Sequence, residues 1–351
     1  MVRLLWLLLL FPAALALGAL YQWAGALKDR RRFLGLGTMF DIGDGRRLYM
    51  SQRGSGGPSV IFESGIAATS QNWAQMQEAV SNFAHTVAYD RGGLGWSSPN
   101  TTERTPSNIV AELRLLLQQA GVAPPYVLVG HSFGGLIVRH FAAAFPDEVA
   151  GVVLVDPMRP EDWPPLKEAQ RPMVERGIRL AGLGVPVARF GLARLATTSL
   201  FCRSGKASRL FSRAAGSGGL HVLDRVTCEV SKMPRWVWPI VAAHWSSPKF
   251  YRGLAAHLHA VPATVREMAD AKPVIGIPLC VLTAGTAEPL SPDAVRSIGP
   301  EAEQVIAENC GHWVHLDDHA LVLQTTREMV EQIRSNSAVA VETADELSSM
   351  R

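Results

Sequence analysis

Short apolar runs alternate with helix-like stretches along the chain from about residue 39 onward. Six of these runs are rich in β-branched and aromatic residues and predict strands: RRLYMSQRG, PSVIFESG, HTVAYDRGG, YVLVGHS, GVVLVDP and PLCVLTAG. Most are almost continuously apolar, as expected for strands covered by helices on both faces. The pattern therefore predicts an α/β fold with a mostly parallel sheet.

One helix-like stretch between these strands, residues 105–121, shows the covering role clearly. Thr105 is placed to cap it, Pro106 suits its first turn and Gly121 suits its end. Its apolar residues recur at helical spacing and form a single face: Ile109, Leu113, Leu116, Leu117 and Ala120. A helix with one apolar face can pack on a sheet, so we expect this helix to have a structural role and no catalytic one.

The N-terminal 32 residues predict a membrane anchor. Leu4 to Leu27 is apolar apart from Gln22, which is long enough to cross about 30 Å of hydrocarbon as a helix. The run ends in the basic stretch 28–32, which suits the membrane interface. We therefore expect a single-pass N-terminal transmembrane helix.

A cleaved signal peptide is the alternative, and it would make the protein secreted. Arg3 provides a short basic region, and Ala14-Leu15-Ala16 forms a possible cleavage site. The basic stretch 28–32 favours a cytoplasmic catalytic side, but Arg3 and the amino terminus offset it. The sequence thus leaves the orientation open.

A long insertion separates the sixth predicted strand from the seventh. Ordinary connections take about 2–6 residues, so the segment 157–271 predicts a helical cap. The core then comprises 39–156 and 272–334, and 335–351 is a polar tail that we expect to fray. Four tryptophans of the insertion, with apolar helical runs, predict a roof over an apolar pocket: Trp163, Trp236, Trp238 and Trp245.

Composition excludes several classes of protein. The chain has 351 residues, of which 48% are hydrophobic, so it can bury a large core. Its net charge of +3, from 34 basic and 31 acidic residues, provides no basic stripe for nucleic acid. The four cysteines are widely spaced and predict no zinc site, although pairing of Cys202 with Cys228 stays open. We expect no metal and no cofactor; oligomeric state is not predicted.

The corner Gly-His-Ser-Phe-Gly, residues 130–134, is the candidate for chemistry. Glycines at 130 and 134 allow a strand to turn sharply into a helix, which projects the Ser132 hydroxyl clear of the sheet. The first amides of the new helix point toward the same place and favour developing negative charge. The pattern predicts a nucleophilic serine.

Three further motifs stand in a familiar order: FESGIAATSQNW, YDRGGLGWS and NCGHWVHLDDH. With the corner at Ser132 they resemble the α/β-hydrolase superfamily, from about Met39 to about Arg334. Ser64 stands where that family often has histidine. The resemblance implies that His312 is the general base and that Ile66 supplies a backbone donor to the oxyanion, together with the amide of Phe133.

Other histidines fit this chemistry less well. His315 and His319 are rivals of His312, and His131 is expected to pack beneath the corner. His257 and His259 have no carboxylate at ligand spacing and predict no metal site.

The acid that would orient His312 has two candidates. Glu288 follows the seventh predicted strand, where the superfamily usually carries an aspartate, and it is our preferred choice. Asp156 follows the sixth strand, at a position that some hydrolases of this architecture use. Both stay open.

These features predict a serine hydrolase that cleaves an ester or thioester of a fairly apolar small molecule through an acyl-enzyme intermediate. A serine at position 132 excludes the dehalogenase and epoxide-hydrolase branches, which need aspartate there. A peptidase or amidase of the same fold is a variant, and a non-catalytic ligand-binding protein is the alternative from another class.

Overall fold

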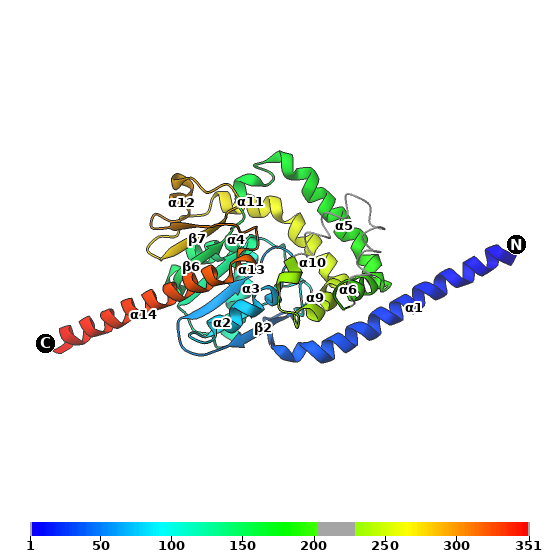
Figure 1. The fold of residues 1–351 in the computed structure, drawn as a ribbon, viewed down its shortest axis with the longest axis horizontal. Helices are drawn as coiled ribbons and strands as arrows, with labels where there is room; N and C mark the ends of the chain where they lie inside the picture. Colours follow the sequence, from blue (N-terminus) through cyan, green and yellow to red (C-terminus); the bar gives the residue numbers. More distant parts are fainter. Residues whose placement is uncertain (1, 203–228, 350–351) are drawn as a thin grey trace.

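A computed structural model describes residues 2–202 and 229–349 (Figure 1). Its centre is an 8-stranded sheet in the order β1-β2-β4-β3-β5-β6-β7-β8. The pairs β1–β2 and β2–β4 are antiparallel and the other pairs are parallel. The strands are β1 (Thr38–Asp41), β2 (Arg47–Arg53), β3 (Ser59–Glu63), β4 (Thr86–Tyr89), β5 (Tyr126–His131), β6 (Val149–Val155), β7 (Leu279–Ala284) and β8 (Glu303–Ala307).

The predicted α/β fold with a mostly parallel sheet is confirmed, and the six predicted strands are β2 to β7. Sequence analysis missed β1 and β8, which form the two edges of the sheet. Both are partly exposed, with burial that follows no apolar run. An edge strand that is half in water lacks the hydrophobic signal that identified the others.

Helices cover both faces of the sheet and bury a large apolar core on each. Outside the cap they are α2 (Ala74–Val80), α3 (Pro106–Gln119), α4 (Phe133–Ala144), α12 (Pro292–Ile298), α13 (Val314–Asp317) and α14 (His319–Ser349). One core includes residues of α3 and α4, and the other includes residues of α2 and α14. The two layers of helices hold the central strands rigidly.

Helix α3 packs as its sequence predicts, with one correction at its start. Four of the five predicted face residues are buried in the core, and Ala120 is partly buried against it. Thr105 occupies the cap position, but its side chain makes no capping hydrogen bond. Gly121 has φ +68, a conformation that glycine adopts without strain.

The insertion between β6 and β7 forms a helical cap. Its described helices are α5 (Arg171–Arg189), α6 (Leu192–Cys202), α9 (Trp238–Trp245), α10 (Pro248–His259) and α11 (Val261–Ala269). Helix α11 also joins the main core through Val261, Val265 and Met268. The end of the insertion therefore ties the cap to the α/β body.

Two long helices project from the body in roughly opposite directions (Figure 1). One is α1 (Val2–Phe33). The helical segment Leu10–Leu36, which includes most of α1 and the short turn after it, is long and apolar enough to cross a membrane. A signal sequence near an N-terminus would have the same property. The other is α14, which is helical from His319 to Ser349. The fraying expected of the polar tail stays a prediction.

Candidate active site

The predicted corner after β5 is a sharp strand-to-helix turn. Ser132 has φ 55, a left-handed conformation that is costly for serine, and α4 begins at the next residue. A Cβ on Gly130 would lie 2.6 Å from the Gly134 carbonyl oxygen, and one on Gly134 would lie 2.4 Å from the Glu63 carbonyl oxygen. Both positions therefore require glycine, as the sequence pattern indicated.

Ser132, His312 and Asp156 form a continuous hydrogen-bonded chain. The Ser132 hydroxyl lies 2.9 Å from His312 Nε2, and His312 Nδ1 lies 2.6 Å from Asp156 Oδ2. With the proton on Nδ1, the ring donates to the carboxylate and accepts from the hydroxyl. Because the three residues come from the ends of β5 and β6 and the loop before α13, the fold itself assembles them.

The carboxylate that bonds His312 is that of Asp156 and not that of Glu288, our preferred candidate. Asp156 has φ 42, and its second carboxylate oxygen accepts from Ala284 N at 3.0 Å. Its own N–H donates to the Leu282 carbonyl, so Asp156 is held between the ends of β6 and β7 with one oxygen toward His312. Glu288 lies farther along the turn after β7, where its backbone carbonyl accepts from Arg159.

The two expected oxyanion donors flank the nucleophile. A Cβ built on Gly65 would lie 3.7 Å from Ser132 Cβ, so the loop that carries Ile66 touches the corner. In the turns and loops that the structure describes, neither the Ile66 nor the Phe133 N–H donates to a backbone carbonyl. Both donors are available for a developing negative charge.

A buried ion pair that sequence analysis missed supports this loop. Arg91 Nη1 lies 2.6 Å from Glu63 Oε1 and 2.5 Å from the Ser64 carbonyl oxygen, and Arg91 Nη2 donates to the Gly65 carbonyl. Tyr89 donates its hydroxyl to Glu63 as well. Burial raises the pKa of the Glu63 carboxyl, while the Arg91 charge opposes that shift.

The pairing had a signal in the sequence. Glu63 ends β3 and Arg91 follows β4, and these two strands are parallel neighbours. Opposite charges at the same ends of adjacent parallel strands are placed to meet.

Two other histidines lie close to this site. His131 Nε2 donates to the His312 carbonyl at 2.8 Å, so the expectation that His131 packs beneath the corner fits the structure. Burial holds the pKa of His131 well below its usual value, with further lowering by His315 and His312. Burial also lowers the pKa of His315 to about 3, and its ring stacks on Trp73 at 4.4 Å. Both rings are therefore neutral at physiological pH.

The remaining predicted residues lie outside this chain of hydrogen bonds. His319 begins α14, while His257 is buried in α10 and bonds the Gly253 carbonyl through Nδ1. Within the described residues, no group of three or more potential ligands could hold a metal ion. Cys280 and Cys310 are free, and the possible pairing of Cys202 with Cys228 falls outside the described residues.

The cap tryptophans divide between several environments. Trp238 and Trp245 pack against a small apolar cluster that joins the cap to Ala74 of α2 and to Trp313, the neighbour of His312. Trp163 packs on the main core, and Trp236 is exposed. The cap thus contacts both the helix after the oxyanion loop and Trp313 of the histidine loop, and it brings apolar residues to that loop.

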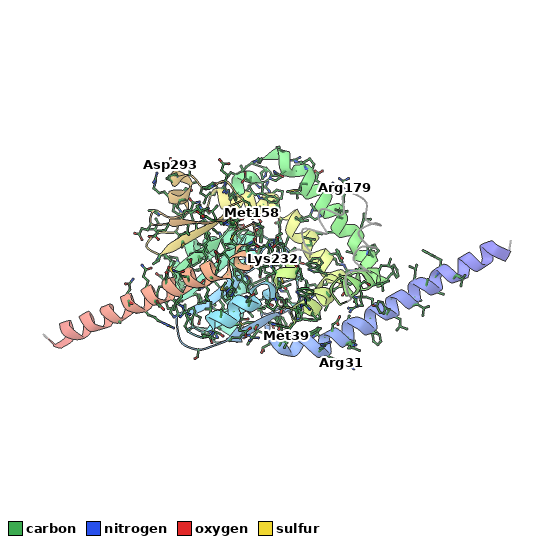
Figure 2. All side chains as sticks on the ribbon, viewed as in Figure 1. Arg31, Met39, Met158, Arg179, Lys232 and Asp293 are labelled. Atoms are coloured by element: carbon green, nitrogen blue, oxygen red, sulfur yellow. The ribbon has the colours of Figure 1, made fainter. Side chains whose placement is uncertain are left out.

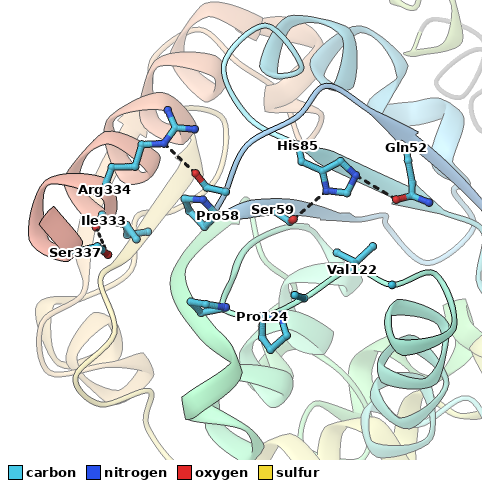
Figure 3. A pocket seen from close by; sticks show the side chains of 13 residues that line it. Gln52, Pro58, Ser59, His85, Val122, Pro124, Ile333, Arg334 and Ser337 are labelled. Carbon is cyan, nitrogen blue, oxygen red and sulfur yellow. Dashed lines mark hydrogen bonds between the residues drawn. The ribbon is translucent and has the colours of Figure 1, made fainter. Parts of the chain in front are cut away.

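The larger of two described grooves, about 630 Å³, lies away from this site (Figure 3). It is lined by the starts of β3, β4 and β5 and by α14, whereas Ser132 follows the end of β5. In Figure 3, His85 bridges Ser59 and Gln52 by hydrogen bonds. The groove is therefore at the edge of the sheet opposite to the nucleophile.

A serine–histidine–carboxylate chain at the carboxyl edge of a mostly parallel sheet defines a class of hydrolase-type sites. A family profile of the alpha/beta hydrolase fold matches residues 58–319. The chain belongs to this family.

Individual relatives match over shorter stretches. An uncharacterized Bacillus subtilis protein is 35% identical over 106 residues, 30% of this chain and 42% of that protein. Lipase LipV of Mycobacterium tuberculosis is 35% identical over 114 residues, 31% of this chain and 41% of the lipase. These matches span only about two fifths of each relative.

Solved structures share the whole fold at low identity. An esterase from Thermogutta terrifontis superposes with a TM-score of 0.56 at 20% identity, covering 85% of this chain and 98% of the esterase. This likeness concerns the fold alone.

Proposed function

We propose that the protein is a serine hydrolase that cleaves an ester or thioester of a fairly apolar small molecule. The observation that carries this proposal is the chain Ser132–His312–Asp156, with distances of 2.9 Å and 2.6 Å. Relatives named as a lipase and an esterase agree with hydrolase chemistry. The apolar residues that the cap brings to the His312 loop favour an apolar acyl or alcohol group.

The reaction would proceed in two halves. Ser132 Oγ attacks the carbonyl carbon while His312 Nε2 takes its proton, and Asp156 stabilises the imidazolium. The oxyanion accepts hydrogen bonds from the Phe133 and Ile66 amides. His312 then protonates the leaving alcohol or thiol, and a water activated by His312 releases the acid and restores Ser132.

We further propose that α1 anchors the enzyme in a membrane. The segment Leu10–Leu36, which includes most of α1, has the required length and hydropathy, and the basic residues in the last turn of α1 suit the interface. A secreted enzyme after signal cleavage is the alternative, and the side of the membrane is left open.

A fluorophosphonate probe tests the catalytic proposal directly. Wild-type protein is expected to be labelled and to hydrolyse p-nitrophenyl esters of increasing chain length, whereas Ser132→Ala does neither while keeping its thermal unfolding midpoint. Losing the nucleophile leaves about 10³–10⁴-fold catalysis over water. Turnover by Ser132→Ala equal to wild type would refute the mechanism. Faster cleavage of amides than of esters would favour the peptidase or amidase variant, and wild-type protein without labelling or turnover would favour a ligand-binding protein.

A further inference from the structure

Helix α1 does not stand free of the protein, because part of it packs against the cap. A Cβ on Gly18 would lie 2.3 Å from the Phe190 carbonyl oxygen, and one on Gly25 would lie 2.5 Å from Arg194 Nε. Gly191 in turn approaches the Gly18 carbonyl. These contacts bring the backbone of α1 against the corner between α5 and α6, in the manner of closely packed membrane helices.

Arg194 of α6 joins the same two parts through polar bonds. Its Nε donates to Gln22 Oε1 at 2.9 Å, and its Nη1 lies 2.5 Å from Asp29 Oδ2. Both Arg194 and Gln22 are buried. This contact explains the single polar interruption of the apolar run, and it matches the rule that charged residues near lipid face protein and are paired.

The outer side of the cap carries an unusual set of exposed large apolar residues. We call it the outer cap stripe: Met173, Leu180, Leu183 and Val187 of α5, with Leu192 and Leu195 of α6. The four α5 positions recur at spacings of seven, three and four, so they share one face of the helix. A neighbouring side of α5 packs on α10, where a Cβ on Gly184 would meet Tyr251.

The two helices that carry the outer cap stripe, α5 and α6, lie on the side of the molecule from which α1 projects (Figure 1). Arginines 176 and 179 are exposed on α5 among its leucines, and Figure 2 shows Arg179 on the outer side of that helix. Mixed leucines and arginines are typical of helices that lie in the membrane interface, where apolar groups enter the acyl region and arginines reach the phosphates.

The length of α1 connects these observations. Gly18 is ten residues before Lys28, which corresponds to about 15 Å along a helix, and the hydrocarbon layer is about 30 Å thick. If the apolar run lies in the bilayer with its basic end at the interface, the parts of the cap that pack on Gly18 and Gly25 are carried into contact with lipid.

We propose that the outer cap stripe is a lipid-binding surface, which places the α5–α6 corner in contact with the hydrocarbon layer beside α1. The occupant is the bilayer, because the stripe flanks the point where α1 leaves the protein and continues its exposed apolar surface. The inference rests on the proposed membrane role of α1. It deepens the proposed function, because a cap in contact with lipid takes its apolar substrate from the membrane.

Photocrosslinking of the full-length protein tests this surface without requiring turnover. The photoreactive residue p-benzoylphenylalanine replaces Leu183 or Leu192, and the protein is reconstituted in phosphatidylcholine and phosphatidylglycerol vesicles. Leu115, exposed on α3 of the core, is the matched control, and Leu17 of α1 reports on the anchor. We expect about tenfold more lipid adduct at Leu183 and Leu192 than at Leu115.

Each other result contradicts the proposal in a different way. Lipid adducts at Leu17 alone would support the membrane anchor but show that the cap does not contact lipid. Adducts at none of the positions would remove the anchor as well, and adducts with a second copy of the chain would make the stripe a protein interface. None of these results depends on whether Ser132 is a nucleophile.

Kinetics provide a second measurement. The double change Leu183→Asp and Leu192→Asp is expected to slow hydrolysis of an ester dispersed in vesicles about tenfold relative to Leu115→Asp. Hydrolysis of a short water-soluble ester is expected to be unchanged in both variants, because it requires only an intact catalytic site. Equal loss on the two substrates would assign the stripe to cap stability and overturn the proposal.

Discussion

Arg91 donates to the carbonyl of Gly65, and that carbonyl belongs to the same peptide unit as the N–H of Ile66. Because a trans peptide is planar, its N–H points away from its C=O. Arg91 therefore fixes the direction of a proposed oxyanion donor from behind, and its charge polarises that peptide. Since Arg91 and Glu63 are both buried, the arrangement is rigid before any substrate arrives.

This relationship makes Arg91 a positioning residue whose effect is expected in kcat. In Arg91→Lys the charge opposite Glu63 remains, but one ammonium cannot reproduce the fork that reaches two carbonyls. We expect kcat to fall by about tenfold to a hundredfold with KM changed by less than about twofold, since a full oxyanion donor is worth about 10²–10³. Steady-state kinetics on one p-nitrophenyl ester measure kcat and KM.

The matched control for this change is Arg46→Lys. Arg46 also pairs with a buried carboxylate, that of Glu112 at 2.6 Å, but it does not contact the oxyanion loop in the described hydrogen bonds. An equal drop of kcat in both variants would mean that Arg91 acts only through general stability.

Exchange of the two candidate acids for amides distinguishes their roles. Asp156→Asn is expected to lower kcat by up to about 10⁴, because the amide leaves His312 in the wrong tautomer. Glu288→Gln is expected to stay within about tenfold of wild type, since among the described residues Glu288 is hydrogen-bonded through its backbone carbonyl and not through its carboxylate. The opposite ranking, measured in folded protein, would return the acid to Glu288.

Buried neutral histidines predict a loss of stability in acid. His244 lies edge-on to Trp96 at 4.8 Å, neither ring nitrogen has a partner in the described residues, and burial lowers its pKa to about 4. Its pKa in the unfolded chain is about 6.5. Between these values the unfolded chain binds a proton that the folded chain does not, so the free energy of unfolding falls as pH drops from about 6.5 to about 4.

His244→Phe removes this proton uptake. Urea unfolding at about pH 7.5 and about pH 5 should show a pH-dependent loss that is smaller in the variant by about 2 kcal/mol. At the higher pH the ring is neutral in both states, so that measurement isolates the change in packing. An identical pH-dependent loss in the two proteins would refute the assignment.

Membrane attachment predicts that full-length protein sediments with membranes and resists extraction by alkaline carbonate. The physical reason is that the apolar surface of α1 is largely exposed in the protein alone, so it is more stable in the hydrocarbon of a bilayer than in water. Sequencing of the mature N-terminus is the control. A chain that begins at Leu17 would establish signal cleavage in place of an anchor.

Much of the fold and part of the site could be predicted from the sequence because some residues are constrained by their immediate neighbours. Ser132 needs glycine on both sides, and buried central strands need continuous apolar runs. The acid was harder, since Asp156 and Glu288 both follow neighbouring parallel strands. Their difference lies in the left-handed backbone of Asp156 and its bond to Ala284, which no local pattern encodes.

The contact of α1 with the cap was beyond sequence reasoning for a related reason. Gly18 and Gly25 look ordinary within an apolar run, and Arg194 is far away in the chain. Only the folded structure shows that the polar Gln22 in this run accepts a hydrogen bond from Arg194. Long-range pairs of this kind have no signature at either residue alone.

If α1 is a membrane anchor, the bonds of Arg194 to Gln22 and Asp29 also fix the height of the enzyme above the bilayer. A flexible tether would let the enzyme tumble and sample every height above a bilayer. A helix bonded to the cap holds Ser132 at one height instead. If α1 is embedded, the distance from lipid surface to nucleophile selects substrates by how far their scissile bond can rise, so chain length is discriminated before any contact with the catalytic residues.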